Sequence, residues 1–237
     1  MSKYYSLEEY STITEPIGEN YLNIIHVNIR SFQKNFDPLT SFLNCLPKPP
    51  DVLVVTETWL KESTKHLYSL DGYISHHLVR TEREQGGITI FIKDDLTAEL
   101  LNNFSYINDN IEILTTKLKV SNSTFIISVI YRPHSKHELV NEFSDIISEI
   151  LSNDIFRRNK SILLGDFNIN LLEHATHPPT CSFLSSLQAL SYFPHISRPT
   201  RFPDNPDLGR PSLLDHIWTN FTPSSSSGIF HCSLPDH

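Results

Sequence analysis

The sequence contains little cysteine and no long apolar segment, and each absence excludes a class of protein. Its three cysteines, Cys45, Cys181 and Cys232, lie far apart and show the spacing of neither a zinc site nor a disulfide framework, which indicates a reducing compartment. No apolar run approaches the roughly 20 residues that cross a bilayer. The N-terminus lacks the basic and apolar regions of a signal peptide. We therefore expect a soluble, nuclear or cytoplasmic protein with no membrane partner.

The chain also lacks an excess of basic residues. Its 27 acidic residues outnumber its 19 lysines and arginines, and the formal net charge is −8. Most DNA-binding domains are basic, so this balance argues mildly against a nucleic-acid partner. A metal-dependent nuclease, however, concentrates carboxylates around a cation that reverses the local field. The charge therefore predicts weak non-specific affinity for DNA and does not exclude a nuclease.

Apolar strands and amphipathic helices alternate along the chain, whose 237 residues suit one large α/β domain with a sizeable core. The spacing of apolar residues predicts helices over residues 36–46, 135–153 and 181–191. A hairpin is expected where residues 111–120 and 124–131 flank a short polar turn. The mixture lacks strict βαβ regularity, which favours two packed sheets flanked by helices.

The segment most informative about function is Leu163-Leu164-Gly165-Asp166-Phe167-Asn168. Its apolar start predicts a short buried strand. Residues two positions apart at a strand end project from the same face, so we expect Asp166 and Asn168 side by side. A carboxylate can orient a water, and an amide can hydrogen-bond phosphate oxygens. The pair indicates chemistry on a phosphate ester, and a β-turn formed by Asp and Asn is the alternative interpretation.

Other polar residues follow predicted strands in the same way. Asn28 follows the first apolar run, Glu57 closes residues 52–56, and Tyr131 with Arg132 closes residues 125–130. Further polar positions beside predicted strands are Arg198, Thr200, Arg201, Asp215, Asp236 and His237. Strand ends converge on one rim of a sheet, where ligand sites usually lie, so we expect these side chains to form one site.

This ordered set of motifs resembles the endonuclease/exonuclease/phosphatase superfamily, which includes deoxyribonuclease I and the apurinic/apyrimidinic endonucleases. It is most similar to the endonuclease domain at the start of LINE-type (non-LTR) retrotransposon polyproteins. The supporting motifs are Asn28, Thr56–Leu60, Gly86–Phe91, Tyr131–Pro133, Gly165–Asn168, Pro199–Arg201, Leu214–Ile217 and Asp236–His237. The resemblance implies an α/β (α+β) fold: a four-layer, DNase I-like sandwich of two packed mixed β-sheets flanked by helices.

The resemblance further implies a metal-dependent phosphodiester hydrolase, a DNA endonuclease that nicks target DNA to prime reverse transcription. Glu57, with Asn28 nearby, would hold a divalent cation, Mg²⁺ with Mn²⁺ as the alternative. Asp236 would assist the metal or the geometry of the site. The expected partners are double-stranded DNA and a reverse transcriptase domain downstream in the same polyprotein.

The same resemblance assigns the catalytic roles. Asp166 would orient or deprotonate the attacking water, and Asn168 would hydrogen-bond the phosphate. Tyr131 would donate its phenol to the phosphate or its developing charge. Asp215 would orient and charge His237, which would bind the scissile phosphate or transfer a proton.

The DNA-facing residues implied by the resemblance are Arg132, Thr200 and Arg201. Two further readings of the whole chain stay open beside the endonuclease. One is a phosphatase or phosphodiesterase of the same superfamily that acts on a small molecule or lipid. The other is an inactive retrotransposon fragment.

The chain departs from the family pattern near its end. Pro235 stands where the family usually has serine, and proline removes a backbone donor. The family continues for one more strand after the histidine matched by His237. We therefore expect residues 21–237 to form a C-terminally truncated domain that lacks its last strand. Residues 1–20 are expected to be a polar lead-in, whose disorder is left open.

Overall fold

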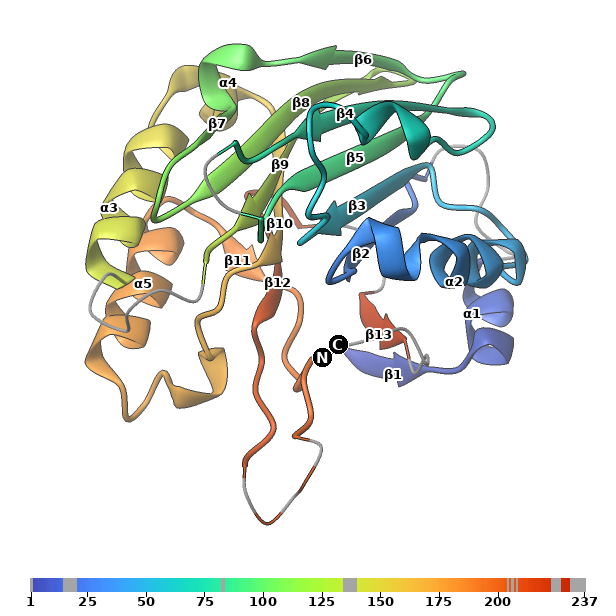
Figure 1. Cartoon of the computed structure of the whole chain (residues 1–237). Helices are drawn as coiled ribbons and strands as arrows, with labels where there is room; N and C mark the ends of the chain where they lie inside the picture. Colours follow the sequence, from blue (N-terminus) through green and yellow to red (C-terminus); the bar gives the residue numbers. More distant parts are fainter. Residues whose placement is uncertain are drawn as a thin grey trace.

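The computed structural model describes residues 2–14, 21–81, 84–133, 140–203, 209–222 and 227–230, together with Asn205 and Asp207. Two mixed β-sheets pack against each other, and helices cover their outer faces (Figure 1). This arrangement confirms the expected α/β sandwich of two sheets flanked by helices.

The larger sheet has seven strands in the order β11-β12-β10-β9-β8-β6, with β7 paired to β8. Their bounds are β6 Thr97–Leu100, β7 Tyr106–Ile107, β8 Glu112–Val120, β9 Ser123–Tyr131, β10 Lys160–Asp166, β11 Phe193–Pro194 and β12 Asp215–Thr219. The central pair, β9 and β10, is parallel, and β8 and β12 flank it in antiparallel register. The predicted hairpin is confirmed as β8 and β9.

The smaller sheet has four strands in the order β2-β3-β5-β4. Their bounds are β2 Ile24–Asn28, β3 Val52–Thr56, β4 Tyr73–Leu78 and β5 Ile88–Lys93. The described helices are α1 Leu7–Thr14, α2 Phe32–Asn44, α3 Val140–Leu151, α4 Asp154–Arg158 and α5 Pro178–Ala189, with short 3-10 turns at Lys65–Leu67, Asn102–Phe104 and Leu171–Glu173.

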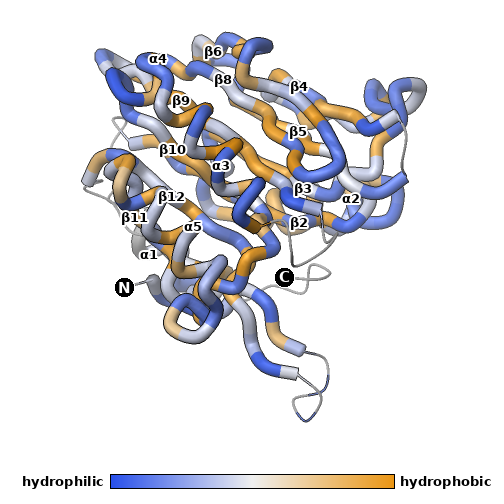
Figure 2. Tube along the Cα trace, turned by 90° about the vertical axis from the view of Figure 1, so that its left-hand side faces the viewer, coloured by the Kyte–Doolittle hydropathy of each residue, from blue (hydrophilic) through white to orange (hydrophobic). Residues whose placement is uncertain are grey.

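Strand periodicity divides the interior into three apolar layers. In β3, Val52 and Val54 face the larger sheet, whereas Leu53 and Val55 face α2. On the outer face of the larger sheet, α3 and α5 pack over alternate residues such as Leu163. Figure 2 shows apolar residues along the strands and hydrophilic residues in most connections. Alternation therefore determines which side chains of each strand enter the space between the sheets.

Two helices begin elsewhere than the sequence predicts. α2 begins at Phe32 rather than residue 36, because Phe32 is fully buried against the smaller sheet. α5 begins at Pro178, and a proline at the first helical position loses no helical hydrogen bond. α3 is described from Val140, and the first part of the predicted helix, residues 135–139, lies outside the described residues.

Residues 2–14 form structure that the expected lead-in did not include. β1, Lys3–Tyr5, pairs in parallel with β13, Gly228–Phe230, and α1 follows it. The ring of Tyr10 is buried and meets Phe230 edge-on, with 4.8 Å between ring centroids. The segment is ordered because one apolar face packs on the body, although most of its residues are polar.

Candidate active site

The candidate site lies where the space between the two sheets meets the ends of their strands. Ile162 and Leu164 of β10 face the smaller sheet, so alternation sends Asp166 to the same side. In β2, Ile24 packs in the layer between the sheets, so Asn28 also points inward. The polar residues thus come from the rims of two facing sheets rather than from the rim of one.

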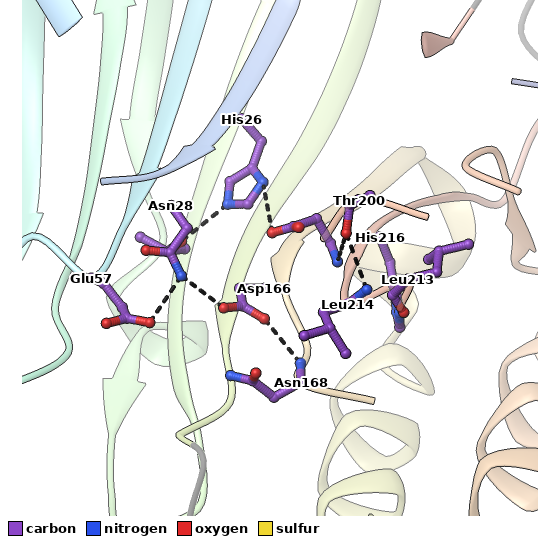
Figure 3. A network of polar contacts seen from close by, with 11 residues as sticks. His26, Asn28, Glu57, Asp166, Asn168, Thr200, Leu213, Leu214 and His216 are labelled. Carbon is purple, nitrogen blue, oxygen red and sulfur yellow. Dashed lines mark hydrogen bonds and ion pairs between the residues drawn. The ribbon is translucent and has the colours of Figure 1, made fainter. Parts of the chain in front are cut away.

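The side chain of Asn28 joins two carboxylates at this junction. Its Nδ2 donates to Glu57 Oε1 at 2.9 Å and to Asp166 Oδ2 at 2.8 Å (Figure 3). Asn28 and Asp166 are each only 1% exposed. Because both carboxylates accept from the nitrogen, the amide oxygen of Asn28 takes part in neither bond.

Glu57 occupies a strained turn directly after β3. Glu57 has a φ of 55° and Trp59 a φ of 53°. Each such conformation costs on the order of 1–3 kcal/mol in a residue other than glycine and persists only where its surroundings hold it. One of these restraints is the bond from Ser31 N to Glu57 O, 2.8 Å long. The strain indicates that the fold gives up some stability in order to hold the Glu57 carboxylate in this position.

Asp166 and Asn168 are neighbours through a turn rather than through strand alternation. β10 ends at Asp166, and Asn168 has a φ of 47°. The backbone N–H of Asn168 donates to Asp166 Oδ1 at 3.0 Å, and its side-chain Nδ2 donates to the carbonyl of Arg132 at 2.7 Å. Gly165 allows β10 to pair closely with β9 just before this turn, because a Cβ there would lie 1.9 Å from the carbonyl oxygen of Ile130. Asp166 and Asn168 are therefore close together, as expected, but the turn brings them together rather than strand alternation.

Tyr131 ends β9 and is buried beside this pair. Burial raises the pKa of its phenol well above the usual value, and the charges of Glu57 and Asp166 raise it further. The phenol therefore stays protonated at neutral pH and can donate a hydrogen bond.

A second polar group lies next to Asn28 and includes Asp215, the first residue of β12. Asp215 Oδ1 lies 3.7 Å from His26 Nδ1, and His26 Nε2 lies 3.1 Å from Thr56 Oγ1. The hydroxyl of Thr200 accepts from the backbone N–H groups of Leu214 and Asp215, each at 3.2 Å. Thr200 thus holds the start of β12, and a cavity of about 130 Å³ borders this group.

His216 is fully buried behind the site and stacks on Phe167, with ring centroids 4.6 Å apart. Its Nε2 faces the carbonyl oxygens of Ile169 at 2.9 Å and Leu213 at 3.2 Å, so this nitrogen carries the proton. Burial lowers the pKa of His216 to about 4. The folded protein therefore holds this ring neutral behind the turn of Asp166 and Asn168.

We expect His216 to make the fold acid-sensitive. Between about pH 6.5 and about pH 4, the unfolded chain binds a proton that the folded chain does not, so stability falls as pH falls. In that window, His216 should lower the free energy of unfolding by roughly 1.4 kcal/mol for each pH unit of acidification. Urea denaturation at several pH values across the window measures the free energy of unfolding. The fall of this free energy with decreasing pH should have a shallower slope in His216→Gln than in the wild type. The exposed His66→Gln variant should keep the wild-type slope, and equal slopes in all three proteins would refute the assignment.

The residues around Asn28 fit a hard divalent cation. No group of three or more His, Cys, Asp or Glu side chains arranged to hold a metal occurs among the described residues. Mg²⁺, however, commonly uses one or two carboxylates and keeps several waters. Asn28 Oδ1 is buried and has no hydrogen-bond partner within the described part of the chain, beside the carboxylate of Glu57. A carboxylate next to an unsatisfied amide oxygen suits such a cation.

The structure brings most, but not all, of the expected site residues together. Asn28, Glu57, Tyr131, Asp166 and Asn168 lie in one group, with Asp215 beside it, as the bonds above describe. The expected positions Pro235, Asp236 and His237 lie outside the described residues.

Two of the three expected DNA-facing residues are buried. Arg132 is 5% exposed, and its Nη1 donates to the carbonyl of Asn168 at 3.0 Å. Thr200 is 8% exposed, and its hydroxyl faces the start of β12. Arg201 is partly exposed. Direct contact with DNA thus suits Arg201, whereas the geometry of Arg132 and Thr200 suits positioning Asn168 and Asp215.

Sequence reasoning assigned no role to three polar residues near the site: His26, Glu112 and His216, the last of which lies in the motif Leu214–Ile217. His26 stands two positions before Asn28 in β2, the same spacing that drew attention to Asp166 and Asn168. Glu112, the first residue of β8, is fully buried. Strand alternation alone could have identified His26, but the burial of Glu112 depends on contacts with distant segments.

A model of the Endonuclease/Exonuclease/phosphatase family matches residues 25–234 of the chain. The protein therefore belongs to the endonuclease/exonuclease/phosphatase family, as the motifs predicted. Its members are hydrolytic nucleases and phosphatases. No curated protein was found to match the sequence.

Solved structures share the fold at low sequence identity. An AP endonuclease from Archaeoglobus fulgidus superposes with a TM-score of 0.62 at 13% identity, covering 84% of this chain and 87% of that one. The endonuclease domain of TRAS1, a telomere-specific non-LTR retrotransposon, has a TM-score of 0.59 at 12% identity, with 83% of each chain covered. The 3'-5' exonuclease NExo from Neisseria meningitidis has a TM-score of 0.59 at 18% identity, covering 84% and 86%. The DNase I-like fold is thus shared by relatives with different activities.

Proposed function

We propose that the protein is a Mg²⁺-dependent DNA endonuclease of the kind found in non-LTR retrotransposons. The observation that carries this proposal is the amide of Asn28, which bridges the carboxylates of Glu57 and Asp166 across the two sheets. One carboxylate, Glu57, is partly exposed, and the other, Asp166, is buried and also accepts from the backbone N–H of Asn168. Glu57 is thus suited to bind a cation, and Asp166 is suited to act on the attacking water.

Each side chain has a defined part in phosphodiester hydrolysis. Mg²⁺, or Mn²⁺ in its place, held by Glu57 and Asn28, would neutralise charge on the phosphate oxygens. Asp166 orients the attacking water and accepts its proton, since Asn28 and the N–H of Asn168 fix both of its oxygens. The phenol of Tyr131 donates to the phosphate, and preorganised donors of this kind stabilise charge that develops in the transition state.

A surface beside the site supports DNA as the substrate. Residues 200–203 and 209–214 run away from the body of the protein (Figure 1), joined by backbone bonds between Arg201 and Ser212. Arg210 is exposed and Arg201 is partly exposed along this excursion, and Arg198 is exposed just before it. Local positive charge can hold a phosphate backbone despite an acidic net charge. On this proposal, Arg201 contacts DNA while Arg132 and Thr200 position the catalytic side chains.

The rest of the proposal follows from the retrotransposon assignment. Asp236 and His237 would complete the site, with Asp215 orienting the histidine. The working partner would be a reverse transcriptase domain of the same polyprotein, and the working compartment the nucleus or cytoplasm. No helix among the described residues is long and apolar enough to cross a membrane.

Supercoiled plasmid distinguishes an endonuclease from other family activities. With Mg²⁺, the protein should convert supercoiled plasmid to the nicked circle. Chelation should abolish the conversion, and the Asp166→Asn substitution should slow it strongly. A closed circle has no ends, so an exonuclease or a phosphatase leaves it unchanged. Release of nucleotides or phosphate from a linear duplex, with an intact closed circle, would refute the endonuclease proposal and favour the phosphatase alternative. A cooperatively folded protein that is inert on both substrates would favour an inactive fragment.

A further inference from the structure

A buried ion pair lies outside the proposed set of catalytic and metal-binding residues. The Glu112 side chain is completely buried and accepts from Arg80 Nε through Oε1 and from the backbone N–H of Gly87 at 2.7 Å through Oε2. Arg80 Nη2 also donates to the carbonyl of Asn108 at 2.7 Å. Both oxygens of Glu112 are therefore engaged within the protein. Because a buried ion pair is a weak source of stability, its presence here suggests another role.

The pair is connected by hydrogen bonds to the turn that carries Glu57. The carbonyl of Gly87 accepts from Thr58 N at 3.2 Å, and the carbonyl of Gly86 accepts from Trp59 N at 2.8 Å. Thr58 and Trp59 directly follow Glu57 in the chain. A shift of the Gly87 backbone would therefore pass directly to the strained turn of Glu57.

The packing between these segments is close. Gly86 and Gly87 have φ values of 99° and 88°. A Cβ on Gly86 would lie 2.3 Å from Glu112 Oε1, and one on Gly87 would lie 2.6 Å from Thr58 Oγ1. Only glycine tolerates both the backbone conformation and the close approach. The position of Glu112 therefore constrains the two glycines, and the glycines in turn constrain the turn of Glu57.

Electrostatic coupling also places Glu112 near the site. Burial raises the pKa of Glu112 to about 7, Arg80 and the Gly87 N–H oppose this rise, and the charge of Glu57 adds to it. In the register of β8 and β9, Glu112 lies opposite Tyr131. The carboxylate is thus close enough to Glu57 and Tyr131 for its charge to act on both.

We propose that Glu112 and Arg80 are positioning residues for the cation site. They hold Gly86 and Gly87, which keep Glu57 in the left-handed conformation that presents its carboxylate beside Asn28. This inference rests on the proposed function, in which Glu57 is the metal ligand.

Titration of the 237-residue chain with MnCl₂ alone, followed by calorimetry, tests the inference without relying on turnover. Glu112→Gln should weaken Mn²⁺ binding by about 10- to 100-fold, the range typical of groups that orient metal ligands. Arg80→Lys, which keeps the charge but not the fork of donors, should fall between Glu112→Gln and wild type. If Glu112→Gln does not melt cooperatively, the Mn²⁺ affinity of Arg80→Lys decides the test.

Asp51→Asn is the matched control. Asp51 also accepts from a cation, Lys93 Nζ, and from a backbone N–H, that of Asn23, each at 2.8 Å. It lies at the other end of β3, so its loss should affect stability and leave Mn²⁺ affinity unchanged. Folded Glu112→Gln and Arg80→Lys variants with wild-type affinity would overturn the inference, as would an equal loss in Asp51→Asn. A wild-type protein that binds no Mn²⁺ would instead overturn the metal site of the proposed function, and the inference with it.

Discussion

Replacing Asp166 with asparagine is expected to lower the rate of plasmid nicking by about 10²- to 10⁴-fold, the contribution usual for a general base. The substitution removes the group that takes a proton from water and preserves the shape of the side chain. It also sets an amide between two donors, Asn28 Nδ2 and the N–H of Asn168, so one of these hydrogen bonds is lost. Single-turnover rates at saturating Mg²⁺ measure the effect on chemistry.

The Asp166→Asn variant also tests whether the site, rather than the fold, is impaired. Its thermal transition should stay cooperative, and its Mn²⁺ affinity should change much less than its rate, because Glu57 and Asn28 are intact. Asp154→Asn is a suitable control, since Asp154 is exposed and its partner Arg158 is on the same short helix. Retention of full activity by Asp166→Asn would exclude this carboxylate as the base.

Replacing Glu57 with glutamine is expected to raise the Mg²⁺ concentration needed for half-maximal nicking by at least about tenfold. Hard cations prefer carboxylate oxygen, and the substitution removes the negative charge from the proposed ligand set. Asn28 Nδ2 can still donate to the glutamine oxygen, so the amide that bridges to Asp166 should stay in place. The measurement is the nicking rate as a function of Mg²⁺ concentration, with activity largely recovered at high metal.

The effect of Glu57→Gln should be specific to that position on the turn. Glu62, exposed and paired with Lys65 a few residues later, provides the comparison: Glu62→Gln should follow the wild-type Mg²⁺ curve. If both variants shift alike, the change reflects general surface charge. An unshifted curve for Glu57→Gln would remove Glu57 from the metal site.

Much of the fold was predictable because its signals are local. The apolar run before Glu57 indicated a buried strand, and the polar turn between β8 and β9 marked a hairpin. Helix starts were less accurate, since Phe32 and Pro178 join their helices through burial and first-turn geometry. Residues 2–14 were predicted to be part of a polar lead-in from their composition. Composition is insensitive to a few well-placed apolar side chains such as Tyr10.

The sequence by itself identified which polar residues stand at strand ends and which face of each strand they occupy. The order of Asn28, Glu57, Tyr131 and Asp166 along the chain, each at a strand end, predicted one site, because alternation is a property of the backbone. Only the tertiary structure decided that Asn28 and Asp166 meet across two sheets, that Arg132 and Thr200 are buried, and that Glu112 supports the turn of Glu57. These relations depend on contacts between segments far apart in the chain, which no local pattern encodes.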